Sequence, residues 1–166
     1  TAQLLQMQHG AGIEELRIID PRNAFVMDSL LRDVTIYGTA ARASATLKRK
    51  DLAGKTGTTN EHVDAWVCGY QQTLTGCAWM GFDQPKRIKD NAQGGQLAAP
   101  AWAAFMREVY ERKPAPPDWP RPFGIVSMAI DPVTGLRAGP ACMSDSVRVE
   151  YFLPGTEPQG ECTRTP

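Results

Sequence analysis

The sequence is poor in the residues that build metal sites, and its charge has no excess of either sign. It holds only two histidines, His9 and His62, and its four cysteines form no Cys-x-x-Cys pair. Because a structural zinc site needs closely spaced ligands, we expect no metal. Eighteen basic and eighteen acidic side chains cancel, which argues against a nucleic-acid partner, since binding phosphates requires a basic face. No pattern in the sequence points to a cofactor.

Long apolar runs are also missing. No stretch approaches the roughly 20 residues that span a bilayer, and the N-terminus lacks the pattern of a signal peptide. Hydrophobic residues make up 42% and charged residues 22% of the chain, a composition typical of soluble globular proteins. The 166 residues suffice for one domain, or for part of a domain with a small appendage, and a longer parent protein could still carry a membrane anchor.

Two segments have the period of helices. Asp20-Pro21 provides an N-cap and a first-turn proline before an apolar stripe at 27, 30, 31 and 34, so we expect a core helix over 21–37. A second helix is expected over 97–112, with Trp102, Phe105, Met106 and Val109 on its buried side.

Three strands are expected between these helices, over 51–59, 64–70 and 75–82. The second places Trp66, Cys68 and Tyr70 on one face, and the link 71–74 makes the last two strands an antiparallel hairpin. If this link is a four-residue loop, Cys68 faces Cys77, close enough for a disulfide.

The C-terminal part reads as a separate tail. Five prolines fall between Pro114 and Pro122, which predicts a stiff linker. We therefore divide the chain into a partial domain (1–113), a linker (114–122) and a small β-rich tail (123–166). A strand over 125–130, the turn 131–135 and a strand containing Val147, Val149 and Tyr151 make up the tail. Cys142 and Cys162 could close it by a second disulfide, which would fit an oxidising compartment.

The segment from Lys55 to Thr59 carries the chemistry. It places an ammonium, three hydroxyls and a glycine on one short strand, with Thr56 and Thr58 on one face and Lys55 and Gly57 on the other. Such a segment could hold a carboxylate, or bind a peptide by strand addition. A phosphate-binding loop is excluded because its first glycine would fall at Arg49. An ordinary strand with a solvated lysine is the plain alternative.

The surroundings of this segment favour a specific family. Residues 52–60, with Asp64-Ala65-Trp66, Gly69-Tyr70 and Gly81-Phe82-Asp83 after them, resemble the third signature block of class A penicillin-binding proteins. The helix that begins at Pro21 and the tail motif Tyr151–Pro158 are also similar to that family, and the resemblance extends over residues 17–162. It implies an α/β (α+β type) fold, part of a penicillin-binding/β-lactamase-like transpeptidase domain, in which helices flank an antiparallel sheet and a β-rich appendage follows.

The resemblance implies acyl transfer at a serine that cross-links peptidoglycan stem peptides and is trapped by β-lactams. Lys55 would supply positive charge to the active serines. The hydroxyls of Thr56 and Thr58 would bind the donor carboxylate, and the Thr58 N–H would serve the oxyanion hole. Gly57 would keep the strand open, and Thr59 and Asn60 would lie beside the substrate.

The nucleophile motif of the family, Ser-x-x-Lys, does not occur in the sequence. Ser44 and Lys48 are one residue too far apart, Ser29 is followed by arginine at the third position, and Ser144-Asp145-Ser146 is not the second motif, Ser-x-Asn. Because both motifs precede the Lys-Thr-Gly block in the family, we expect an upstream segment of the same polypeptide to supply them. The 166 residues alone are expected to be inactive.

The family implies a parent protein at the periplasmic face of the bacterial inner membrane, held by an anchor and carrying a glycosyltransferase domain. Two alternatives remain open. One is a β-lactamase or D,D-carboxypeptidase, which shares the Lys-Thr-Gly strand, and the other is a non-catalytic binding module in which residues 123–166 contact a partner.

Overall fold

The computed structural model describes residues 18–113, 117–142 and 146–163. They belong to two compact units, one formed by Met27–Pro120 and the other by Thr1–Val26 with Arg121–Pro166. Residues 1–17 of the predicted partial domain lie outside the described residues. Within the described ranges the fold is mixed α/β, with two small antiparallel sheets and three α-helices. None of the described helices is long and apolar enough to cross a membrane.

Helix α2 (Pro21–Ile36) confirms the first helix prediction. The Asp20 carboxylate accepts the Arg22 N–H at 2.8 Å, which satisfies one of the unpaired donors at the start of the helix. The prediction that its apolar stripe is buried in a core is wrong, since Met27 is 55% and Leu30 51% exposed. The buried residue of this helix is Thr35. Leu31 and Val34 of the same stripe are half-buried, so the described residues cover one side of the predicted apolar face and leave the other exposed.

The larger sheet has the antiparallel order β1-β2-β3, with β1 (Ala53–Thr58), β2 (Ala65–Gln71) and β3 (Leu74–Met80). All three predicted strands are confirmed, with ends shifted by one or two residues. Gln71 pairs with Leu74, so the hairpin turn has two residues rather than the expected four. The predicted pairing of Cys68 with Cys77 is present because shortening the loop by one residue on each strand preserves the register.

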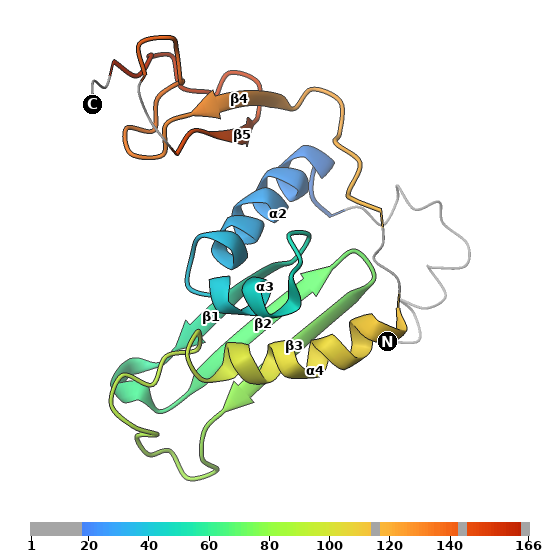
Figure 1. Cartoon of the computed structure of the whole chain (residues 1–166), viewed down its shortest axis with the longest axis vertical. Helices are drawn as coiled ribbons and strands as arrows, with labels where there is room; N and C mark the ends of the chain where they lie inside the picture. The colour runs from blue at the N-terminus through green and yellow to red at the C-terminus, as the bar shows by residue number, and fades with distance from the viewer. Residues whose placement is uncertain (1–17, 114–116, 143–145, 164–166) are drawn as a thin grey trace. The chain divides into compact units, whose positions relative to one another are not determined.

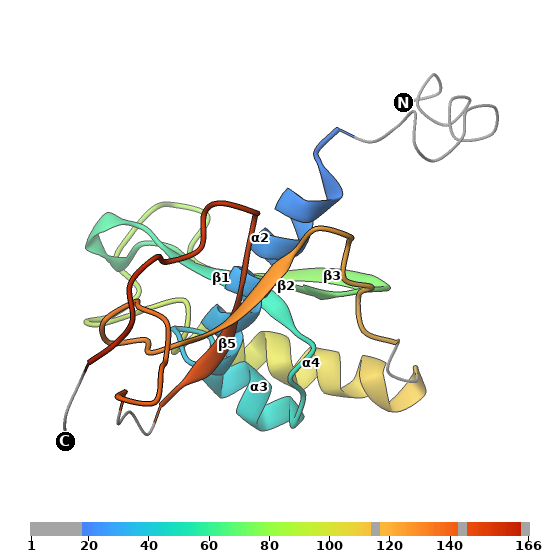
Figure 2. The same cartoon turned by 90° about the horizontal axis from the view of Figure 1, so that it is seen from above.

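Two helices, α3 (Ala41–Leu47) and α4 (Ala98–Arg112), cover one face of this sheet (Figure 1 and Figure 2). The residues buried between sheet and helices are Ala43, Leu52, Ala65, Val67, Ala98, Ala99, Trp102, Ala103 and Met106. Alanines predominate, so the helix backbones approach the strands closely. Helix α3 is not among the predicted helices, and its seven residues carry no apolar stripe. High alanine content, which favours helix, is the signal that could have revealed it.

Helix α4 confirms the second helix prediction, but one residue of its expected buried face is misplaced. Trp102 and Met106 are buried, whereas Phe105 is 66% exposed. The sequence spacing of these large residues fits one stripe, yet the contact surface is centred on the small residues Ala99 and Ala103. Packing at close distance therefore rotates the buried face away from Phe105.

The second unit contains a two-stranded antiparallel sheet, β4 (Val126–Ile130) and β5 (Arg148–Phe152). The turn after β4 follows the Asp-x-x-Thr-Gly sequence: Gly135 donates its N–H to the Asp131 carbonyl at 2.8 Å and adopts φ +69°. A non-glycine residue would be strained in this left-handed conformation. The ring of Tyr151 on β5 makes an edge contact with Phe25, with centroids 5.2 Å apart.

Candidate functional site

Strand β1 carries the Lys-Thr-Gly-Thr sequence at the edge of the described sheet, since β2 is its paired neighbour. The register sets Thr56 opposite Val67, a buried residue, and Lys55 opposite Cys68. Paired residues of antiparallel strands point to the same face. The threonines therefore lie on the face that α3 and α4 cover, and Lys55 lies on the other face, as predicted from strand alternation.

Lys55 is exposed, and its ammonium has a partner in its own strand. The Nζ atom donates to the carbonyl oxygen of Thr56 at 2.8 Å. This contact holds the cation beside the strand rather than in open solvent. A carboxylate that arrives at the strand could replace or share the carbonyl, because an ammonium has three donors.

The hydroxyls of Thr56 and Thr58 each meet a partner from outside the strand. The Thr56 hydroxyl lies 2.7 Å from the hydroxyl of Thr39, in the segment between α2 and α3. The Thr58 hydroxyl accepts the backbone N–H of Gly94 at 3.0 Å. Sequence reasoning missed both Thr39 and Gly94, and only the Gly94-Gly95 pair could have suggested that a backbone approaches here.

Gly57 and Gly94 allow segments to pack tightly at the end of the strand. A Cβ on Gly94 would lie 2.5 Å from the Gly57 carbonyl oxygen and 2.2 Å from that of Trp66. A Cβ on Gly57 would press on the Trp66 Cβ at 3.2 Å. The close approach of Trp66 on β2 therefore explains why the signature has a glycine at position 57, whether or not a ligand also approaches there.

The turn after β1 is a short 3₁₀ helix, η2 (Asn60–His62), with exposed Thr59 and Asn60 at its start. Glu61 and His62 have φ values of +61° and +57°, a conformation uncommon for side chains of this size. The ring Nδ1 of His62 lies 3.1 Å from the Ala92 carbonyl oxygen. This contact makes His62 part of the loop scaffold.

The four cysteines form two disulfides, Cys68–Cys77 on the sheet and Cys142–Cys162 in the tail. Cys68 lies between Lys55 and Cys77 in register, so the first disulfide adjoins the signature strand on the face of Lys55. The second joins segments that are 20 residues apart in sequence.

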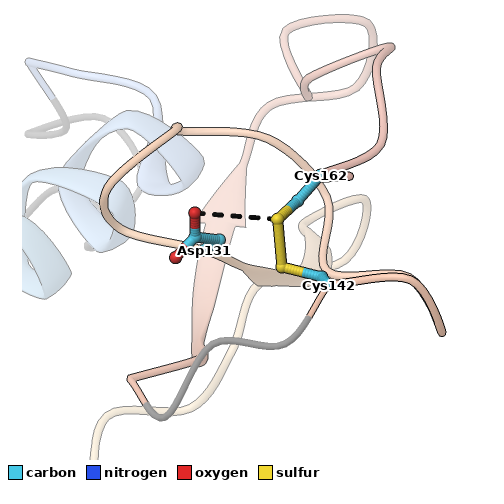
Figure 3. Close-up of side chains that lie close together, drawn as sticks. All are labelled: Asp131, Cys142 and Cys162. Atoms are coloured by element: carbon cyan, nitrogen blue, oxygen red, sulfur yellow. Dashed lines mark hydrogen bonds between the residues drawn. A yellow bond between two sulfur atoms is a disulfide. The ribbon is translucent and has the colours of Figure 1, made fainter. Parts of the chain in front are cut away.

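Figure 3 shows the tail disulfide beside Asp131, whose carboxylate is fully buried. The Cys162 Sγ lies 3.8 Å from Asp131 Oδ2. Oδ2 also accepts the N–H and hydroxyl of Thr134, at 3.1 and 2.8 Å. The three side chains are near enough to surround a metal ion, but the sulfur atoms are joined to each other and offer no thiolate ligand. The Asp131 carboxylate serves the turn instead.

Comparison with known proteins gives one consistent family. Residues 121–165 match the family described as "Penicillin-binding protein 1A, C-terminal domain". Over 124 residues the chain is 48% identical to penicillin-binding protein 1A of Pseudomonas aeruginosa, an alignment that covers 75% of this chain and 15% of that protein. It is 38% identical over 150 residues to penicillin-binding protein 1A of Neisseria lactamica, covering 84% of this chain and 18% of the relative.

A solved structure extends the similarity to the fold. The crystal structure of penicillin-binding protein 1A from Haemophilus influenzae matches with a TM-score of 0.72 and 33% identity, over 88% of this chain and 22% of that one. The chain thus spans less than a quarter of the length of the relatives described here. From sequence and fold together, the chain belongs to the class A penicillin-binding protein family, in the region that includes the C-terminal domain of penicillin-binding protein 1A.

Proposed function

We propose that this chain is the C-terminal part of a peptidoglycan D,D-transpeptidase, and that β1 is its substrate-binding strand. The parent protein would cross-link stem peptides by serine acyl transfer and would be acylated by β-lactams, which mimic the donor peptide. Its setting would be the bacterial cell envelope, with a glycosyltransferase domain elsewhere in the polypeptide. Family membership supports this proposal, and the arrangement of β1 gives it a physical basis.

The main support is the position of the signature residues around a strand edge. Lys55 lies on one face of β1, and Thr56 and Thr58 lie on the other. A ligand that contacts all three must therefore lie along the edge that β2 does not occupy. An extended peptide that binds this edge would use main-chain hydrogen bonds for affinity and the flanking side chains for recognition.

The chemistry of the edge suits an anionic peptide terminus. The Lys55 ammonium and the Thr56 and Thr58 hydroxyls can surround a carboxylate, such as the terminus of a stem peptide or the acid group of a β-lactam. The Thr58 N–H would donate to the oxyanion that forms when a serine attacks the carbonyl. One donor of this kind contributes about 2.7–4 kcal/mol to transition-state stabilisation in other acyl-transfer enzymes.

The attacking group would come from a segment upstream of the described residues. None of the five serines of the chain, at 29, 44, 127, 144 and 146, has a lysine three residues later. In this proposal the chain binds the substrate carboxylate and stabilises the charge of the oxyanion. The serine–lysine pair that forms the acyl-enzyme lies elsewhere in the polypeptide.

We also propose that the tail over 123–166 is a structural unit separate from the transpeptidase part over 1–113, with 114–122 as the linker. The boundary between two compact units after Pro120 supports a division within the linker, and so does the family match that begins at residue 121. The segment up to Val26 groups with the tail, so the assignment of that segment to the transpeptidase part is drawn from the sequence alone.

The test is β-lactam acylation of a protein that contains this chain and its complete transpeptidase domain. Lys55→Ala should slow acylation by a fluorescent penicillin roughly 10- to 100-fold, the loss expected when a charged hydrogen-bond partner is removed. Lys50→Ala, which removes an exposed lysine just upstream of the strand, is the matched control and should acylate normally. Normal acylation of a folded Lys55→Ala protein would remove Lys55 from the site, and failure of the unmodified protein to react would favour the binding-module alternative.

A further inference from the structure

The turn between β1 and β2 is held by a hydrogen-bond network that the signature motif does not include. Asp64 donates its N–H to the Thr59 hydroxyl at 2.8 Å, and Thr59 donates its N–H to the Asp64 carbonyl at 3.2 Å. These two bonds join the residue that follows β1 to the residue that precedes β2. They close the turn directly after the Thr58 donor.

The Asp64 side chain then ties this turn to the far strand of the sheet. Its Oδ1 accepts the indole N–H of Trp79, on β3, at 2.8 Å. Trp79 packs against Trp66 with ring centroids 6.2 Å apart, and Trp66 in turn pairs with Gly57 on β1. A connected path therefore runs from β3 to the end of the signature strand, partly through the indole–carboxylate bond and partly through the two rings.

The geometry of the turn explains why such a tie is needed. Glu61 and His62 both occupy the left-handed region, where non-glycine residues are strained and persist only if their surroundings hold them. His62 is held on its side by the Ala92 carbonyl and by the N–H of Ile88, which donates to the His62 carbonyl at 3.0 Å. Asp64 and Trp79 provide the corresponding support on the other side.

We infer that Asp64 and Trp79 are positioning residues for the acyl-transfer reaction, which fix the 59–64 turn so that the Thr58 N–H and the adjoining edge of β1 keep the orientation that the substrate requires. This inference rests on the proposed function of β1. According to this inference, Asp64 and Trp79 do not touch the substrate. Both act through the backbone between Thr58 and Asp64.

If Trp79 only stabilised the fold, its removal would lower the global stability of the protein; a positioning residue should instead lower the acylation rate. Trp79 is 43% exposed and its bond lies at the surface, where water can replace a lost partner, so removing the bond should change global stability little. Its effect should fall on the local geometry instead, and a displacement of about 1 Å at a reacting group can lower a rate a hundredfold.

The experiment uses the protein with its complete transpeptidase domain and measures single-turnover acylation by a penicillin, separated into the dissociation constant of the first complex and the acylation rate constant. Asp64→Ala and Trp79→Phe should each lower the acylation rate constant roughly 10- to 100-fold, with a much smaller change in the dissociation constant. Asp64→Asn should stay within about threefold of the unmodified protein, because its amide oxygen still accepts the indole N–H.

Trp102→Phe is the matched control. The Trp102 indole donates to the Gly76 carbonyl at 2.9 Å on the opposite face, and this buried residue supports the core. Its loss should lower the melting temperature while the acylation rate constant stays near normal.

Three outcomes would overturn the inference: normal rate constants for Asp64→Ala and Trp79→Phe, equal losses for Asp64→Asn and Asp64→Ala, or an equal loss for Trp102→Phe. Lys55→Ala separates these from failure of the proposed function. If Lys55→Ala is inactive while the Asp64 and Trp79 variants react normally, the positioning role of Asp64 and Trp79 is disproved and the proposed function of β1 stands.

Discussion

The backbone N–H of Gly94 donates to the hydroxyl oxygen of Thr58 over 3.0 Å. A hydroxyl group can accept two hydrogen bonds but donate only one. Because Gly94 occupies an acceptor position, the Thr58 hydrogen remains available to a ligand. The loop that carries Gly94 thus prepares Thr58 to act as a donor to a carboxylate.

This arrangement predicts the behaviour of Thr58 variants in the protein with its complete transpeptidase domain. Thr58→Val removes the donor and leaves the Gly94 N–H unpaired, so β-lactam acylation should fall roughly 10- to 100-fold, the equivalent of a hydrogen bond to a charged group. Thr58→Ser keeps the hydroxyl and should retain most of the rate. Kinetics of penicillin acylation measure both.

Thr73→Val is the control for this prediction. The Thr73 hydroxyl accepts an N–H of the Gln71 side chain at 2.7 Å in the β2–β3 turn. Thr73→Val therefore removes a hydrogen bond similar to the one between Thr58 and Gly94, but away from the proposed ligand site. A Thr58→Val protein as active as Thr73→Val would mean that the hydroxyl does not contact the ligand.

A second prediction concerns Tyr110, on α4. Its ring lies 4.4 Å below the Arg49 guanidinium, and its hydroxyl is buried without a hydrogen-bond partner among the described residues. Because Phe keeps the ring and removes the unsatisfied group, Tyr110→Phe should be neutral or stabilising by about 1 kcal/mol at neutral pH. Tyr70→Phe is the comparison: the Asp28 carboxylate helps to raise the pKa of the Tyr70 hydroxyl, so removing that hydroxyl should be less favourable than removing the one on Tyr110. Urea denaturation compares the two, and a clear loss of stability in Tyr110→Phe would contradict the prediction.

The same tyrosines predict how stability depends on alkaline pH. Burial raises the pKa of Tyr110 to about 12, assisted by the charge of Asp51 and opposed by that of Arg49. Burial, together with Asp28, also raises the pKa of Tyr70 to about 12. Between pH 10 and 12 the unfolded chain would lose these protons while the folded chain keeps them, so stability should fall as pH rises through this window. Tyr110→Phe should make the decline shallower, which urea midpoints measured from pH 9 to 11 would reveal.

The disulfides give a further prediction. No free thiol should be found in the denatured, unreduced protein, because both pairs are joined. A double Cys142→Ser, Cys162→Ser variant should lose about 3 kcal/mol on the loop-entropy relation for a separation of 20 residues. Loss of Cys68–Cys77 should cost less, since its separation is 9 residues and the β2–β3 hairpin already closes that loop. Detection of four free thiols would contradict both bonds.

The sequence predicted the elements of the larger unit well where a local period was strong. The Asp20-Pro21 signal located the start of α2, and alternation along 64–70 located β2 and its faces. The pairing of Cys68 with Cys77 followed from the register of the predicted hairpin. In each case the determining interactions lie within a few residues or across one turn, which makes them readable without the fold.

What the sequence did not predict depends on segments that meet over long distances. The contact between Thr58 and Gly94 joins residues 36 apart, and no local pattern encodes it. Phe105 looked buried because its spacing fits a stripe, but the alanines of α4 determine which side meets the sheet. The bond from the Trp79 indole to Asp64 depends on the register of two strands and on the turn between them.

The last prediction is that the 166-residue chain alone does not react covalently with penicillin. Acylation needs a serine activated by a base within hydrogen-bond reach, and no serine of this sequence has a lysine at the third following position. Lys55 and the Thr58 N–H can only stabilise charge once a nucleophile has attacked. Incubation with a fluorescent penicillin, a denaturing gel and intact-mass measurement should therefore find no adduct on this chain, whereas the longer protein that includes an upstream Ser-x-x-Lys segment should be labelled. A stoichiometric adduct on the 166 residues would identify a nucleophile within them. It would refute the proposal that this chain stabilises charge while an upstream segment supplies the serine.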